Sequence, residues 1–75
     1  MSSKTPVVTG PALLRALLRA GFRKDRQSGS HVIVEHPDGR FASIPMHGKR
    51  TIPIGTLHGI LVQAGLDVET LRRLL

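Results

Sequence analysis

The stretch HVIVEHPDGRFASIPM, residues 31–46, decides the fold, because it holds two strand-like runs joined by a turn. At the turn, Pro37 presets φ, Asp38 hydrogen-bonds locally and Gly39 accepts a positive φ. The runs on either side are therefore predicted to form an antiparallel hairpin. Pro45 has no N–H for the sheet ladder, so the second run is expected to lie at a sheet edge or to end there.

Side chains alternate between two faces along the runs 31–36 and 40–46. One face is apolar and should meet the helices: Val32, Val34, Ala42, Ile44 and Met46. The opposite face is mixed and should stay open: His31, Ile33, Glu35, Phe41, Ser43, Pro45 and His47. Apolar residues exposed among polar ones often mark a partner surface.

A helix is predicted before the hairpin, over residues 9–21. Thr9 is suited to the N-cap, Pro11 to the first turn and Gly21 to the stop. Its core-facing side is expected to carry these leucines: Leu14, Leu17 and Leu18, with Leu13 beside them.

Two more helices are predicted after the hairpin. Residues 56–65 carry apolar side chains at helical spacing and end at Gly65. Residues 66–75 are predicted to form a third, short helix with Asp67 as its cap. This helix is expected to serve packing or dimer contacts.

Together with a short strand over residues 22–27, these elements give the order α-β-β-β-α plus a C-terminal helix. The simplest solution is an α+β fold, in which a three-stranded antiparallel sheet has both main helices on one face. Residues 1–8 are expected to be a flexible tail, and residues 9–75 a single domain.

The composition favours a polyanionic partner. The chain has 75 residues, with 11 Lys and Arg against 5 Asp and Glu, a formal charge of +6. Eight of the eleven basic residues are arginine, which suits bidentate contacts with phosphate. Small size and strong positive charge indicate RNA, or another nucleic acid or nucleotide, as a partner.

The same composition limits the covalent and metal cross-links that the chain can form, and the sequence shows no targeting or membrane-spanning segment. There is no cysteine, hence no disulfide and no thiolate metal site. Nothing resembles a signal peptide or approaches 18 consecutive apolar residues, so we expect a cytoplasmic protein without membrane contact. A chain this short has a marginal core, so a protein partner or a homodimer would be a natural supplement.

Enzymes that need a metal or cofactor are disfavoured. His31 and His36 point to opposite faces of their strand, so no zinc site is expected, and no phosphate-binding glycine loop or dinucleotide motif is present. RNA cleavage suits a small metal-free domain, because the 2′-hydroxyl is an internal nucleophile. It requires a base, a cationic group and an acid, and histidine titrates near neutrality.

Several short strings resemble the HicA family of toxin–antitoxin systems over roughly residues 9–66. They are AGF at the end of the first helix, GSH before the second strand, HPDG in the turn, IPMHGKR after the third strand, and GTLHGILVQAGL on the second helix. The resemblance implies a fold like that of double-stranded-RNA-binding domains. It also implies an endoribonuclease (mRNA interferase) that is neutralised by a HicB antitoxin covering the active histidine.

Carried over residue by residue, the histidine of the family's GSH is His31, the expected general base. Ser30 and His47 are auxiliary candidates, Ser30 for a substrate hydrogen bond and His47 for phosphate positioning or as the acid. His36 and His58 are expected to be a turn residue and a solvated helix residue. Many relatives continue after GSH with a second histidine or a polar residue, whereas this chain continues with an apolar run.

Four basic residues are predicted to contact RNA. Lys49 and Arg50 precede the second helix, whose N-terminus would complete a phosphate site. Lys24 and Arg26 lie on the first strand and are expected to flank His31 across the sheet. Two alternatives stay open: an RNA-binding module of the same fold without catalysis, and an interaction domain for an acidic protein.

Overall fold

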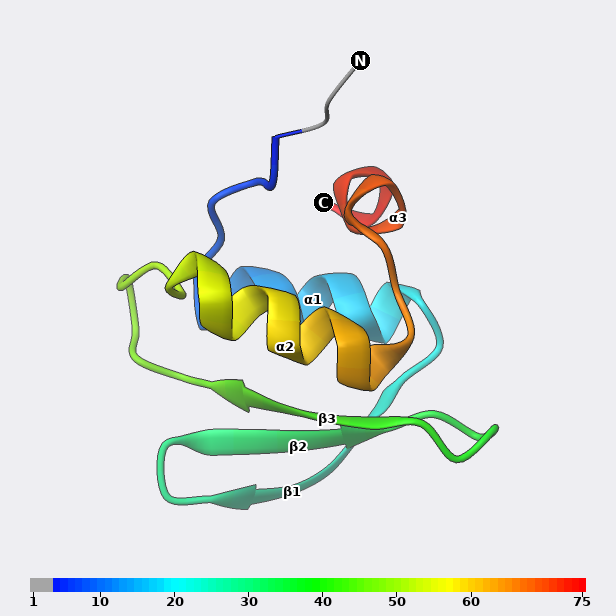
Figure 1. The fold of residues 1–75 in the computed structure, drawn as a ribbon. Coiled ribbons are helices and arrows are strands. Elements are labelled where there is room, and N and C mark those ends of the chain that lie inside the picture. The colour runs from blue at the N-terminus through cyan, green and yellow to red at the C-terminus, as the bar shows by residue number, and fades with distance from the viewer. Residues whose placement is uncertain (1–3) are drawn as a thin grey trace.

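The computed structural model describes residues 4–75. Its elements follow the predicted order: α1 (Gly10–Arg19), β1 (Arg23–Ser28), β2 (His31–Glu35), β3 (Phe41–Pro45), α2 (Ile54–Ala64) and α3 (Val68–Leu74). The α+β class and the α-β-β-β-α order with a C-terminal helix are therefore confirmed (Figure 1).

The three strands form one antiparallel sheet in the order β1-β2-β3. The predicted hairpin pairs β2 with β3, and Val32 lies opposite Ile44 and Glu35 opposite Phe41. As predicted from its missing donor, Pro45 ends the edge strand β3. β1 pairs with β2 through a bulge at Asp25, between Lys24 and Arg26.

The helix ends follow the predicted capping residues. Thr9 Oγ1 accepts a 3.2 Å hydrogen bond from the N–H of Ala12, and an Asp67 carboxylate oxygen accepts one of 2.8 Å from the N–H of Thr70. Gly65 ends α2 with a left-handed φ of 68°. α2 begins earlier than predicted, at Ile54, because Pro53 already serves as its N-cap residue.

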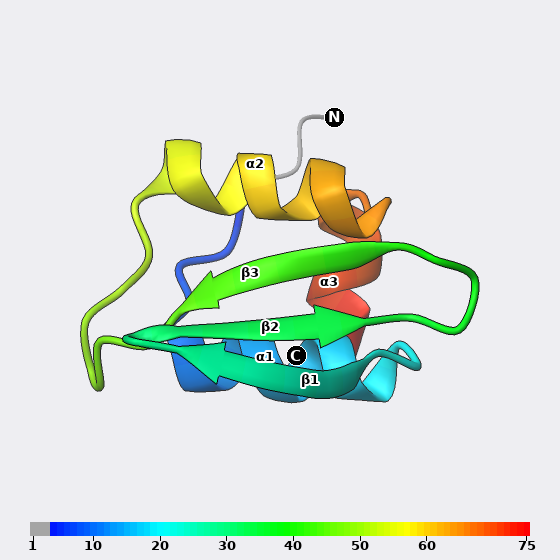
Figure 2. The ribbon, with the colours of Figure 1, turned by 90° about the horizontal axis from the view of Figure 1, so that it is seen from below.

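The helices lie on one side of the sheet (Figure 1), but they are not equivalent. Seen from below, α1 lies behind the sheet and α2 runs along the outer edge of β3 (Figure 2). α2 contacts β3, whereas α1 contacts β3, β1 and α3. α2 therefore borders both the core and the open face of the sheet. Within residues 4–75, no helix has the length and apolar character needed to cross a membrane.

The core lies between the sheet and the helices, and the predicted apolar face of the hairpin is buried in it. The buried side chains are Val8, Leu13, Ala16, Leu17, Phe22, Val32, Val34, Ala42, Ile44, Ile52, Leu57, Ile60, Leu61, Ala64 and Leu71. Met46 is half-buried against this cluster.

The predicted inner face of α1 was partly wrong. Leu13, Ala16 and Leu17 are fully buried, whereas Leu14 is half-buried and Leu18 is 44% exposed. The three buried residues follow the i, i+3, i+4 spacing of one helix face, which turns Leu14 and Leu18 toward the edge of that face. α3 packs on α1 through the buried Leu71, in line with its expected packing role.

Residues 4–8, expected to be a loose tail, make defined contacts. Val8 is buried, and its carbonyl accepts a 2.8 Å hydrogen bond from the N–H of Ile52. Thr5 Oγ1 lies 2.9 Å from Nε2 of His58 on α2, and Arg72 donates to the carbonyl of Lys4. Residues 1–3 of that tail lie outside the described residues, and the flexibility of the whole segment stays a prediction.

Candidate functional site

His31 is the first residue of β2 and follows the two-residue turn Gly29-Ser30. Gly29 has a positive φ of 59°, whereas the φ of Ser30 is not positive. This combination is typical of a two-residue hairpin turn with glycine in its first position. Val32 points into the core, so the neighbouring His31 projects from the open face and is exposed. The predicted accessibility of His31 is confirmed.

The structure brings His47 to His31. In the β2–β3 register His31 lies opposite Pro45, and the next N–H, that of Met46, donates a 2.6 Å hydrogen bond to the carbonyl of Ser30. This bond ties the end of β3 to the turn before β2. The two imidazole rings lie with centroids 6.5 Å apart and planes at 81°.

Ser30 therefore has a structural role through its backbone, since its carbonyl oxygen accepts the bond that places His47. The predicted contact of its hydroxyl with substrate stays a prediction. Both histidines are exposed, so a ligand can reach their ring nitrogens from solvent.

Two adjoining hollows flank this histidine pair. The first, of about 360 Å³, is lined by His31, Ser43, Pro45, Thr56, Gly59, Ile60 and Gln63. The second, of about 300 Å³, is lined by Pro45, His47, Arg50, Thr51, Ile52, Pro53 and Thr56. Pro45 and Thr56 line both, so the two hollows lie side by side in the depression between the sheet edge and α2.

The polar residues that α2 adds to this depression were not anticipated from the sequence. Thr56, Gly59 and Gln63 share one side of the helix at spacings of three and four residues. A glycine inside a helix was the signal in the sequence, because glycine disfavours helix relative to alanine and so indicates a local requirement.

Arg50 and Lys49 lie in the turn that follows His47. The N–H of Arg50 donates a 3.1 Å hydrogen bond to the carbonyl of His47, and Arg50 lines the same hollow as His47. Lys49 is exposed nearby without lining either hollow. Of the four predicted cations, Arg50 is thus the one that shares a hollow with His47.

The two basic residues of β1 that were predicted to contact RNA lie on opposite faces of the sheet. Arg26 lies opposite Ile33, which places it on the face of His31, where it forms a 2.8 Å ion pair with Asp25. Lys24 lies opposite Val34, whose side chain is buried in the core. Because paired residues share a face, Lys24 belongs to the other face, and its predicted position beside His31 is wrong.

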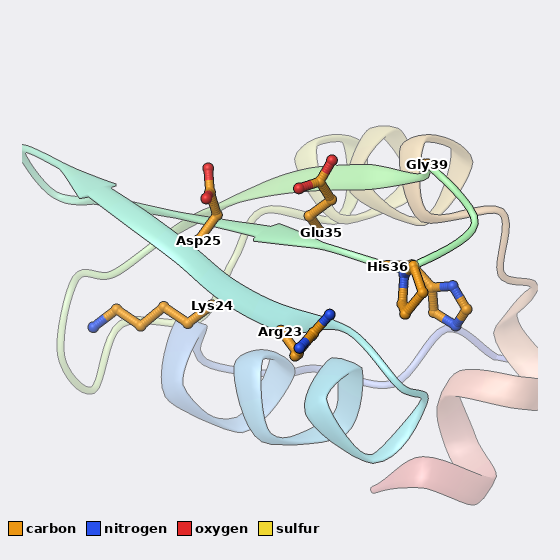
Figure 3. Close-up of a pocket in the computed structure, with 7 residues that line it drawn as sticks. Arg23, Lys24, Asp25, Glu35, His36 and Gly39 are labelled. Atoms are coloured by element: carbon orange, nitrogen blue, oxygen red, sulfur yellow. The ribbon is translucent and has the colours of Figure 1, made fainter.

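A larger hollow, of about 410 Å³, lies at the opposite end of β2 from His31 (Figure 3). Its lining residues are Arg23, Lys24, Asp25, Glu35, His36, Pro37 and Gly39. Asp25 and Glu35 project from the side of the sheet away from α1. Two basic side chains, Arg23 and Lys24, and two acidic ones, Asp25 and Glu35, line this hollow, so its charge is balanced rather than suited to a polyanion.

Next to this larger hollow, several residues stabilise the fold through contacts with one another. The His36 ring packs edge-on against the buried Phe22, with centroids 5.1 Å apart, and the Arg40 guanidinium covers Phe22 at 5.3 Å. The backbone N–H of Arg40 donates to the Asp38 carboxylate and lowers the pKa of that carboxyl. His36 is a turn residue, as predicted, and His58 is exposed on α2.

Within residues 4–75, no three histidine or carboxylate side chains gather in a way that could hold a metal ion. The donor groups at the histidine pair are imidazoles, hydroxyls, an amide and a guanidinium. This set suits proton transfer and anion contact.

The comparisons with known proteins agree with the resemblance in the sequence. A family model described as the HicA toxin of bacterial toxin–antitoxin systems matches residues 10–66, well over half of the chain. A search of curated proteins finds no match. The matched segment contains both histidines, the whole sheet and α2. The chain therefore belongs to the HicA toxin family of bacterial toxin–antitoxin systems.

Proposed function

We propose that this toxin is an endoribonuclease that cleaves mRNA in the cytoplasm without a metal ion, with His31 as general base. The observation that carries the proposal is the pairing of His31 with His47, held by the hydrogen bond between Met46 N–H and the Ser30 carbonyl. Two imidazoles whose centroids lie 6.5 Å apart can contact the same phosphodiester.

In the proposed reaction, neutral His31 takes the proton from a ribose 2′-hydroxyl, and the 2′-oxygen attacks the adjacent phosphorus. The bond from phosphorus to the 5′-oxygen breaks, and protonated His47 gives its proton to that oxygen. The products are a 2′,3′-cyclic phosphate and a 5′-hydroxyl end, so atoms and charges balance. Arg50, beside His47, stabilises the charge that develops on the phosphoryl oxygens.

Arg26 and Lys49 extend the basic surface for flanking phosphates, and the formal charge of +6 attracts the RNA from a distance.

Membership of a toxin–antitoxin family implies a cognate antitoxin as partner. We propose that a HicB-like antitoxin covers the open face, where Phe41 is 56% exposed beside Glu35 and Ile33. An aromatic side chain among polar ones is a typical anchor for such an interface.

The test compares wild type, His31→Ala and His47→Ala, with His58→Ala as the matched control on an exposed histidine outside the site. Purified proteins are incubated with mRNA in EDTA, and the new ends are analysed. Wild type and His58→Ala should produce 2′,3′-cyclic phosphate ends, and His31→Ala should lose at least about 100-fold in rate.

A substrate with a 2′-deoxy sugar at the cleavage site should resist wild type, since it lacks the nucleophile. The mechanism would be contradicted if His31→Ala kept full activity. It would also be contradicted if wild type lost its activity when EDTA was added. RNA binding without cleavage by wild type would favour the non-catalytic RNA-binding module instead.

A further inference from the structure

The hollow beside His31 has an apolar floor and a polar rim. Pro45 and Ile60 are buried beneath it, Ser43 is half-buried, and Thr56 and Gln63 are exposed at its edge. Apart from His31, none of its lining side chains is ionisable. The hollow is shallow and open to solvent, with a volume of about 360 Å³.

Gly59 forms part of the α2 wall of this hollow. It lies inside the helix, where glycine is less favourable than alanine because it loses more conformational freedom on folding. Its backbone does not have a positive φ, and a Cβ built at this position meets no atom within 4 Å. Neither the backbone conformation nor the packing of the folded chain therefore requires glycine here. Gly55 in the first turn of α2 is equally unconstrained, so free space alone does not indicate a function. What distinguishes Gly59 is that it lines the hollow, where a side chain would reduce the space for a ligand.

The chemistry of the lining selects the kind of ligand. The rim offers two hydroxyls, from Ser43 and Thr56, and the amide of Gln63, which together donate and accept hydrogen bonds without net charge. A flat group with apolar faces and a polar edge fits such a site, and a phosphate does not. Proteins that read RNA bind unstacked bases in this way, through their faces and their hydrogen-bonding edges.

We propose that this hollow is a base-binding subsite that receives the nucleobase next to the scissile phosphate. Gln63 reads the edge of the base together with Ser43 and Thr56, and Gly59 leaves room for it. This inference rests on the proposed ribonuclease function, because it takes the position of the scissile phosphate from His31 and His47.

The main test adds one methyl group to the wall of the hollow. Gly59→Ala should raise the melting temperature by about 2–6 °C, because it improves helix propensity without a clash. The same variant should lower kcat/KM for RNA cleavage by roughly tenfold or more, the scale expected when one bound base is lost. A more stable protein with lower activity cannot be explained by misfolding.

The matched control is Gly55→Ala on the same helix. Gly55 also lies in α2, a Cβ there meets no atom within 4 Å, and it lines neither hollow beside the histidines. This variant should leave cleavage unchanged. Equal activity of wild type and Gly59→Ala would overturn the subsite, and so would equal loss in both glycine variants.

Two further measurements separate the subsite from catalysis. Gln63→Glu replaces an amide that both donates and accepts by a carboxylate that only accepts, so sequencing the cut ends of a random RNA pool should show a changed base preference. An unchanged preference would count against base reading. Binding to 2′-O-methyl RNA, which cannot be cleaved, tests the hollow independently: weaker binding by Gly59→Ala supports it even if wild type proves inactive.

If wild type neither cleaves RNA nor binds the 2′-O-methyl RNA, the subsite fails together with the proposed function. If Gly59→Ala weakens only the complex with the antitoxin and leaves both RNA measurements unchanged, the hollow is a protein-binding site and the proposal is wrong.

Discussion

Gly10 links the packing of α1 to the geometry of the histidine pair, and Gly10→Ala tests that link. Gly10 is the first residue of α1 and is buried against the end of β3. A Cβ at this position would overlap the carbonyl oxygen of Pro45 and lie 3.2 Å from Cα of Met46. Both are backbone atoms, so no side-chain rotation can relieve the overlap.

The size of the effect follows from this contact. The end of β3 would have to move away from α1 by roughly 1 Å to restore ordinary van der Waals separation. Such overpacking typically costs about 1–3 kcal/mol, and a domain of this size loses about 4–8 °C per kcal/mol. We therefore expect the melting temperature of Gly10→Ala to fall by about 4–24 °C.

The same movement should reach the site. Met46 donates to Ser30 and precedes His47, so displacement of β3 separates His47 from His31. A misplacement of about 1 Å can reduce the rate by about 100-fold. Thermal unfolding, RNA cleavage and hydrogen exchange of the Met46 amide measure the three effects, with Gly55→Ala as the control for the same substitution in open space. Wild-type stability together with wild-type exchange at Met46 would refute this reasoning.

Three further predictions concern the site, a cap and the partner surface. If His47 is the general acid, His47→Ala should lower kcat/KM for RNA cleavage by at least about 100-fold, measured with the same RNA and EDTA as for His31→Ala. The Thr70 N–H lowers the pKa of Asp67 below its ordinary value of 3.8. The cap therefore stabilises the fold above that value and is lost as pH falls through the lowered pKa. Asp67→Ala should reduce the melting temperature by about 5 °C at pH 7, with a difference from wild type that shrinks in acid. Phe41→Lys should weaken antitoxin binding at least about tenfold in calorimetry and leave RNA cleavage intact.

Local rules were sufficient to predict the elements and the accessible histidine. The turn at Pro37-Asp38-Gly39 and the caps at Thr9 and Asp67 depend on residues close in sequence, so they could be recognised without knowledge of the fold. Alternation alone placed His31 on the open face, because the regular strand β2 has no bulge within it.

Where a prediction failed, the cause was an irregularity or a distant contact. Lys24 and Arg26 are two residues apart and would share a face in a regular strand, but the bulge at Asp25 shifts the alternation by one residue. The expected leucine stripe of α1 was partly wrong because the buried face is Leu13, Ala16 and Leu17, with an alanine at one of its central positions. The distance between His31 and His47 depends on the register of two strands and on the loop beyond them, which sequence spacing does not determine.

The two ends of the sheet differ in their surroundings: packing contacts fill one end, and the hollows beside His31 and His47 lie at the other. At one end, Phe22, His36 and Arg40 pack together, and Arg40 Nη1 donates to the carbonyl of Ala64 at the end of α2. The hydrogen bond from Arg40 ties the C-terminal end of α2 to the residues that follow the hairpin turn. At the other end, the offset helix forms a wall beside the open face, and the depression next to His31 and His47 results from that offset. The contact at the C-terminal end of α2 therefore belongs to the framework that places the helix wall of the hollow beside His31, together with the residues around the histidines.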